Sequence, residues 1–187
     1  NEIGQWIAKS VVDGVGLTAV KQSHGVLRQI LKAAVLDGRL MRNAAEGVPL
    51  PRTKPKEQTA LTLVQLRALA KECGEFQTLV LLAGTTGMRW GEIAALQCKD
   101  VSLLNKTLYV GKAISTGLKG EKVLGGTKTH QNRTIPFSKE LLPALTLLIE
   151  NKNPESHLFQ MPGYGILEYN NFMTRYFRPA LERCNLK

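Results

Sequence analysis

Three prolines within twelve residues divide this chain of 187 residues into two parts. The segment 48–59 reads VPLPRTKPKEQT and also carries Arg52, Lys54 and Lys56. Prolines at this density disfavour a helix or a central strand, because each fixes φ and lacks a backbone N–H. The segment therefore predicts a basic linker, with a domain boundary near residue 56.

Both parts are basic. Residues 1–56 hold nine basic and four acidic side chains, residues 57–187 hold 16 and 11, and the formal net charge is +10. Such an excess favours a polyanionic partner, either nucleic acid or a membrane surface, although two solvated surfaces would give the same composition. A peripheral membrane protein is disfavoured, because no basic helix also carries a strong aromatic apolar face.

Membrane spans and disulfide scaffolds fit the composition poorly. No apolar run approaches the roughly 20 residues that a membrane span needs, and the polar amino end does not resemble a signal peptide. The cysteines are Cys73, Cys98 and Cys184, which are odd in number and far apart. We therefore expect a reduced, cytoplasmic protein without a metal site.

Apolar periodicity predicts a mainly α chain with a small antiparallel β-sheet, an α+β fold. Thr18 is expected to cap a helix that Gly38 closes, and Thr62 with Gln65 has the spacing of a capping box. Residues 84–87 are expected to interrupt the helical pattern. The expected helices are 3–12, 17–40, 63–73, 75–83, 88–97, 138–150 and 167–184, and the expected strands are 107–110, 133–136 and, less regularly, 157–159.

The most informative local pattern is TGMRWGEIAAL at residues 86–96. Arg89 follows a glycine turn at the start of a short helix, where backbone N–H groups favour an anion. Its planar guanidinium can hold two phosphate oxygens, and Glu92, one helical turn later, can orient it. On spacing alone, an ordinary surface Arg–Glu pair is the favoured interpretation.

A second pattern, GGTKTHQNRTIPF, covers residues 125–137. It places Lys128 near the tip of an expected hairpin that returns as a strand, within reach of a phosphate or a leaving oxygen. Without further context, a solvated hairpin lysine is the favoured interpretation. His130 shares the hairpin and would contact either DNA or solvent.

In order and context, these two patterns resemble the catalytic domain of the tyrosine recombinase family, specifically the phage-type integrases. The upstream residues, including Gln5-Trp6-Ile7 and residues 34–40, resemble the later part of that family's helical core-binding domain, although Asn43-Ala44-Ala45 lacks a usual proline. The resemblance implies a partial, SAM-like core-binding domain over 1–56. It implies a catalytic domain over 57–187 that stops before the family's His-x-x-Arg box and nucleophilic tyrosine.

The resemblance also implies an activity, which is site-specific DNA recombination through a 3′-phosphotyrosyl intermediate, without ATP, metal or other cofactor. Arg89 would bind the scissile phosphate, Glu92 would support the site, and Lys128 would protonate the leaving 5′ oxygen. None of Tyr109, Tyr164, Tyr169 and Tyr176 matches the nucleophile, so the chain alone is expected to be inactive.

The implied partners are double-stranded attachment sites, a homo-tetramer on DNA, and host or phage DNA-bending proteins, in the cytoplasm at the bacterial nucleoid. The competing interpretation is a DNA-binding protein that kept the recombinase scaffold without catalysis. The expected DNA contacts are Thr18, Lys21, Gln22, His24, Arg28, Arg52, Lys54, Lys56, His130 and Arg133.

Overall fold

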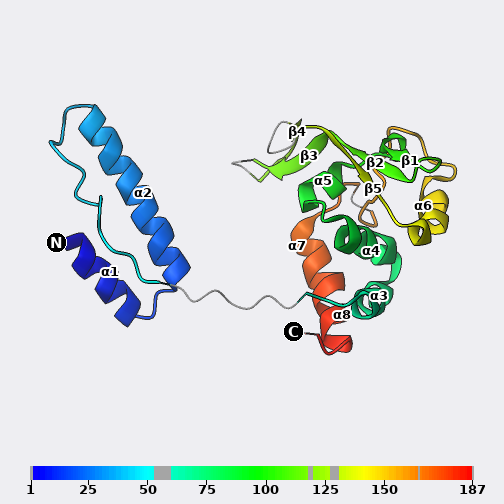
Figure 1. Ribbon diagram of the computed structural model, residues 1–187, viewed down its shortest axis with the longest axis horizontal. Helices are drawn as coiled ribbons and strands as arrows, with labels where there is room; N and C mark the ends of the chain where they lie inside the picture. The colour runs from blue at the N-terminus through cyan, green and yellow to red at the C-terminus, as the bar shows by residue number, and fades with distance from the viewer. Residues whose placement is uncertain (1, 53–59, 118–119, 127–130, 164, 187) are drawn as a thin grey trace. The chain divides into compact units, whose positions relative to one another are not determined.

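The computed structural model of the chain describes residues 2–52, 60–117, 120–126, 131–163 and 165–186. The chain folds into two compact units, Asn1–Thr59 and Ala60–Lys187, so the division falls close to the boundary expected near residue 56. Figure 1 shows a helical first unit and a mixed second unit.

The first unit contains α1 (Glu2–Val12) and α2 (Leu17–Leu36), followed by an irregular segment. Gly16, rather than Thr18, is the N-cap of α2, so the predicted cap was wrong. The preceding turn already starts the helix there, and the N–H of Val20 donates to the carbonyl of Gly16. Gly38 follows the helix with a φ of 71°, a conformation that glycine adopts without strain.

The position of His24 differs from the exposed DNA contact that was expected for it. Its side chain is buried on α2, and Nε2 donates to the carbonyl oxygen of Ala45 at 3.1 Å. Asn43 supports the same segment, because its Nδ2 donates to the carbonyl oxygen of Arg28 at 2.9 Å. His24 therefore fastens the segment after α2 onto that helix and does not face outward.

The second unit begins with α3 (Leu63–Glu72), the 3₁₀ helix η1 (Gly74–Phe76) and α4 (Gln77–Thr86). The predicted capping box of Thr62 and Gln65 is confirmed. The interruption predicted over residues 84–87 starts later than expected, because α4 runs through Gly84 to Thr86 and ends before Gly87. A Cβ at Gly84 would lie 2.7 Å from the terminal methyl groups of Leu66 on α3, so Gly84 makes room for that side chain between the two helices.

The next segment contains α5 (Trp90–Ala95) and the 3₁₀ helix η2 (Cys98–Asp100), and then three strands form one antiparallel sheet. These strands are β1 (Val101–Ser102), β2 (Thr107–Val110) and β5 (Arg133–Pro136), in the order β1-β2-β5. Leu108 of β2 pairs with Ile135 of β5. The strands predicted at 107–110 and 133–136 are confirmed, whereas 157–159 forms only a bridge between Gln97 and His157.

The Gly- and Lys-rich stretch between β2 and β5 forms a separate hairpin of β3 (Lys112–Thr116) and β4 (Lys122–Gly126). Lys128 was expected at a hairpin tip. The turn of this hairpin is closed by the N–H of Gly117, which donates to the carbonyl of Glu121, so it lies earlier in the sequence than Lys128. Lys128 itself, like His130, lies outside the described residues.

The chain ends in helices. Ser138 caps η3 (Lys139–Leu141), which continues as α6 (Leu142–Ile149). The last helix consists of α7 (Tyr169–Phe172), a π-helical turn η4 (Met173–Phe177) and α8 (Arg178–Arg183). Pro179 cannot donate to the carbonyl four residues earlier, which accounts for the irregular turn that precedes it.

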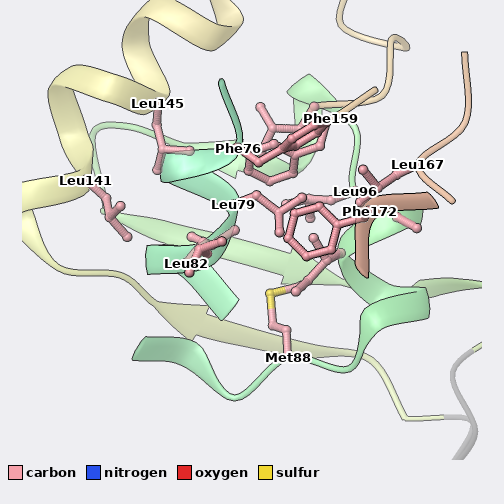
Figure 2. Packing of buried hydrophobic residues seen from close by; sticks show 14 of the residues in the cluster. Phe76, Leu79, Leu82, Met88, Leu96, Leu141, Leu145, Phe159, Leu167 and Phe172 are labelled. Carbon is pink, nitrogen blue, oxygen red and sulfur yellow. The ribbon is translucent and has the colours of Figure 1, made fainter. Parts of the chain in front are cut away.

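One apolar core joins these elements in the second unit. Its buried members come from the helices and the sheet, as Figure 2 shows for Phe76, Leu79, Leu82, Met88, Leu96, Leu141, Leu145, Phe159, Leu167 and Phe172. The predicted α+β class is confirmed. Within the described ranges, no helix is both long enough and apolar enough to cross a membrane.

Gly91 is expected to be a sensitive position in this unit. A Cβ there would lie 2.5 Å from the carbonyl oxygen of Ile114, so Gly91 lets β3 approach α5. We expect the clash in Gly91→Ala to cost about 1–3 kcal/mol. Because alanine favours the helix by roughly 1 kcal/mol over glycine, the net free energy of unfolding should fall by less than the cost of the clash. Urea denaturation measures the change. Gly125→Ala, with no atom within 4 Å of its Cβ, is the control. Equal stability of the two variants would contradict a close approach of β3 to α5.

Candidate active site

A glycine turn and a capping carboxylate place Arg89. Helix α4 ends at Gly87, whose φ is 64°, and the chain then extends before α5 begins. Arg89 is the N-cap of α5, and its backbone N–H donates to Oε2 of Glu92 at 2.9 Å. The sequence pattern thus folds locally so that the Arg89 side chain leaves from the first turn of the helix.

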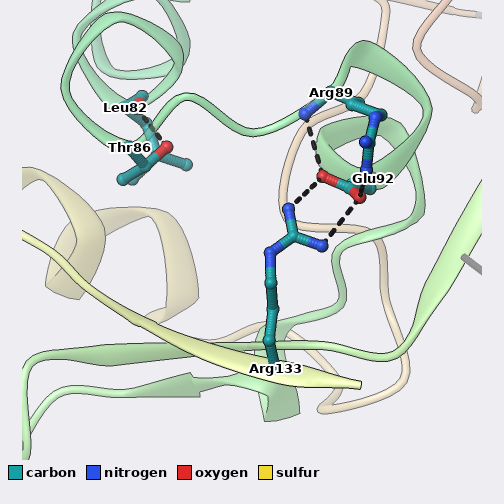
Figure 3. Close-up of polar contacts among 5 residues, drawn as sticks. All are labelled: Leu82, Thr86, Arg89, Glu92 and Arg133. Atoms are coloured by element: carbon teal, nitrogen blue, oxygen red, sulfur yellow. Dashed lines mark hydrogen bonds and ion pairs between the residues drawn. The ribbon is translucent and has the colours of Figure 1, made fainter. Parts of the chain in front are cut away.

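The carboxylate of Glu92 is the centre of a three-residue cluster (Figure 3). Arg133 at the start of β5 donates to both of its oxygens, from Nη1 to Oε1 at 2.9 Å and from Nη2 to Oε2 at 2.7 Å. Arg89 Nη1 donates to Oε1 at 3.2 Å. With the Arg89 N–H, each oxygen accepts two hydrogen bonds, which satisfies the carboxylate.

Burial differs sharply within the cluster. The side chain of Glu92 is 1% exposed, that of Arg133 is 35% exposed and that of Arg89 is 55% exposed. The hydrogen bonds from Arg133 lower the pKa of Glu92 and outweigh its burial, which acts in the opposite direction. Glu92 is therefore a carboxylate at neutral pH, and the same contact raises the pKa of Arg133. Two guanidinium groups and one carboxylate leave a local charge of +1.

Among the residues that the structure describes, Arg89 keeps most of its side-chain donors available. A guanidinium carries five N–H groups, and only one contact from this side chain is made to Glu92. The other donors lie on a half-exposed side chain at a helix start, a position that favours an anion. This geometry suits a phosphate held by two parallel hydrogen bonds.

The structure brings together three of the residues predicted from sequence: Arg89, Glu92 and Arg133. Sequence reasoning missed the contact between Glu92 and Arg133, which lie 41 positions apart. Pairing of the strands at 107–110 and 133–136 would not have revealed this contact, because it sets Arg133 opposite Val110 and does not position α5.

The other expected contacts lie elsewhere. Thr18, Gln22 and Arg28 are exposed on α2, Lys21 is half-buried there, and Arg52 is exposed after it. Lys21, Arg28 and His24 line a cavity of about 450 Å³ in the first unit. Lys54 and Lys56, like Lys128 and His130, fall outside the described residues.

The tyrosines that the structure describes are packed or project from the surface. The ring of Tyr176 meets Phe76 edge-on at 4.6 Å, and burial raises the pKa of its hydroxyl. Tyr169 meets Trp90 edge-on at 5.2 Å, and Tyr109 lies half-exposed on β2.

Comparison with known proteins identifies the family of the chain. Residues 59–182 match the family model described as the phage integrase family. The chain belongs to this family. The match contains Arg89, Glu92 and Arg133 and covers most of the second unit.

Among individual family members, the prophage phiRv2 integrase of Mycobacterium tuberculosis is 29% identical over 163 residues. The alignment covers 84% of this chain but 43% of that integrase, so the chain spans less than half the length of this relative.

Solved structures show that the fold is shared. The integrase of the Tn1549 transposon, in complex with a circular intermediate DNA, matches with a TM-score of 0.79 at 18% identity, over 98% of this chain and 63% of that one. A lambda integrase dimer bound to a COC′ core site matches with a TM-score of 0.67 at 18% identity, over 100% of this chain and 51% of that one.

Proposed function

We propose that the protein containing this chain is a site-specific DNA recombinase that works by transesterification. The observation that carries the proposal is the cluster in which buried Glu92 holds the half-exposed Arg89, within a chain of the phage integrase family. Structural neighbours solved in complex with DNA support the same partner. The substrates would be attachment sites in duplex DNA.

In the proposed reaction, a tyrosine hydroxyl attacks the scissile phosphorus and a 3′-phosphotyrosyl bond forms. The bond from phosphorus to the 5′ oxygen breaks, and that oxygen leaves after taking a proton. A 5′ hydroxyl from another duplex then attacks the phosphotyrosyl link and releases the tyrosine. The bond energy is retained in the covalent intermediate, so the exchange needs no external energy source.

Arg89 would stabilise the charge that develops on the phosphate oxygens in the transition state. Glu92 would hold the guanidinium in position. Lys128 would donate the proton to the leaving 5′ oxygen, which requires a pKa near the working pH. We assign the nucleophile to none of the four tyrosines and propose that it lies outside these 187 residues, so that the chain alone does not cleave DNA.

We propose that the first unit acts as a core-binding domain and helps to grip the duplex. Exposed Arg28 and Arg52 would contact phosphates, which set affinity more than sequence choice. We also propose that the protein assembles as a homo-tetramer on two duplexes. DNA-bending proteins would help this assembly, which would take place at the bacterial nucleoid. Glu92 argues against a purely DNA-binding role, because a buried carboxylate that offsets the charge of Arg89 and Arg133 adds nothing to non-specific affinity.

Binding of this chain to a 30-base-pair duplex is expected to weaken steeply with salt. Each neutralised phosphate contributes a slope of about −0.9 in log affinity against log salt. Arg28→Ala should reduce the slope by about 1. Arg67→Ala is the control, because Arg67 is already paired with Glu140 at 2.7 Å. Fluorescence anisotropy at rising salt measures both slopes. A flat salt response would contradict the DNA-binding part of the proposal.

A further inference from the structure

The contact between Arg133 and Glu92 changes the net charge of the cluster that contains Arg89. If Glu92 faced Arg89 alone, the pair would be neutral, and a buried carboxylate would draw the guanidinium toward itself. Arg133 supplies a second positive charge to the same carboxylate, at 2.7 and 2.9 Å. The cluster then keeps a net charge of +1, and the more exposed of its two guanidinium groups is that of Arg89.

The side-chain hydrogen bonds to Glu92 are also shared unequally between Arg133 and Arg89. Arg133 occupies both carboxylate oxygens with its two Nη groups, whereas the side chain of Arg89 reaches only Oε1, at the longer distance of 3.2 Å. Arg89 is thus held by one side-chain contact and by its own backbone N–H. This leaves its remaining donors for another anion.

We infer that Arg133 is a positioning residue of the recombinase site: it neutralises and orients Glu92 so that Arg89 remains free to bind the scissile phosphate. Arg133 thereby acts through Glu92 and not as a DNA contact, the role expected for it from sequence. The inference rests on the proposed function, and it assigns the start of β5 to the active site.

Arg133→Ala is expected to lower the rate of strand cleavage by the complete protein by about 100-fold, the scale associated with a displacement of about 1 Å in a catalytic group. Affinity for attachment-site duplex is expected to stay within about twofold, because no phosphate contact is lost. Arg133→Lys should recover little, since an ammonium cannot occupy both carboxylate oxygens. Cleavage of a nicked duplex, followed on denaturing gels, measures the rate.

The pH profile gives a readout that a lost DNA contact would not change. Without Arg133, burial raises the pKa of Glu92, so cleavage by Arg133→Ala should fall toward acidic pH where the parent remains active. The charged group facing Glu92 from its own helix is Arg89. Asp100, Tyr109 and Lys112 line the adjoining cavity of about 190 Å³, and all of them remain in the variant.

A double variant separates folding from positioning. Glu92→Gln combined with Arg133→Met buries no unpaired charge, so it should fold even where Arg133→Ala does not. Its cleavage defect should be no larger than that of Glu92→Gln alone or Arg133→Met alone, whichever is slower. Its cleavage rate should also not fall toward acidic pH, because the variant has no carboxyl group at position 92. Arg67→Ala is the matched control, because Arg67 also contacts both oxygens of a glutamate, Glu140, but at an exposed pair.

The inference is overturned if Arg133→Ala cleaves like the parent, or if its defect is a loss of affinity with an unchanged pH profile. Multiplying defects in the double variant would also overturn it, because independent roles multiply. Failure of the proposed function is distinguishable, since the parent protein itself would then form no covalent adduct.

Discussion

Arg89→Ala in the complete protein is expected to slow strand cleavage by about 10²–10³-fold while it spares most DNA binding. In the ground state Arg89 contacts one phosphate among many, so affinity changes by less than about tenfold. In the transition state that phosphate gains charge, and loss of a positioned donor costs about 3–4 kcal/mol, by analogy with an oxyanion hole. Arg89→Lys should recover little, because an ammonium lacks the fork geometry.

Arg89→Ala should remove one side chain from the cluster without leaving Glu92 unpaired. Arg133 keeps its two hydrogen bonds to Glu92, and the backbone N–H at position 89 is unchanged, so the carboxylate stays paired. Thermal unfolding of the variant should therefore resemble that of Arg67→Ala, the exposed control. Gel assays of cleavage and anisotropy assays of binding, run on the same samples, separate the two effects. A parallel loss of binding and cleavage would show that Arg89 serves affinity only.

Lys128→Ala is expected to slow cleavage by about 10²–10⁴-fold, the usual contribution of a general acid. This defect should shrink when the leaving 5′ oxygen is replaced by sulfur, because a thiolate departs without a proton. Arg89→Ala should gain no such rescue, since the phosphate charge it stabilises is present with either leaving group. Single-turnover cleavage of the two substrates measures the difference.

The control for this substitution is Lys139→Ala, which changes a surface lysine elsewhere in the second unit. It should behave like the parent on both substrates. Equal rescue of the Lys128 and Arg89 variants would contradict their separate roles, and so would rescue of neither.

Local patterns predicted much of the fold because their determinants lie close together in sequence. Thr62 and Gln65 are three positions apart and fix the start of α3 by two reciprocal hydrogen bonds. The alternation at 107–110 and 133–136 was sufficient to place β2 and β5. The turn at Gly87 and the cap formed by Arg89 and Glu92 are equally local, so this half of the candidate site could be anticipated.

Features that depend on distant neighbours could not be predicted in the same way. Gly84 has the sequence signature of a helix breaker, yet it lies inside α4, where it makes room for the side chain of Leu66. His24 shares a face with basic residues on α2, but its partner Ala45 comes from a segment with no periodic signal. The contact of Arg133 with Glu92 needs the β2–β5 register as well as the position of α5.

The most direct measurement incubates the complete protein with a nicked attachment-site duplex and resolves the products on a denaturing gel, with the chain 1–187 in parallel. We predict a protein covalently joined to a DNA 3′ end for the complete protein, the same adduct formed about 10²–10³-fold more slowly by its Arg89→Ala variant, and none for the isolated chain. Cleavage without a protein–DNA adduct would contradict transesterification through tyrosine. An adduct formed by the isolated chain and lost on Tyr176→Phe would contradict the placement of the nucleophile outside these residues.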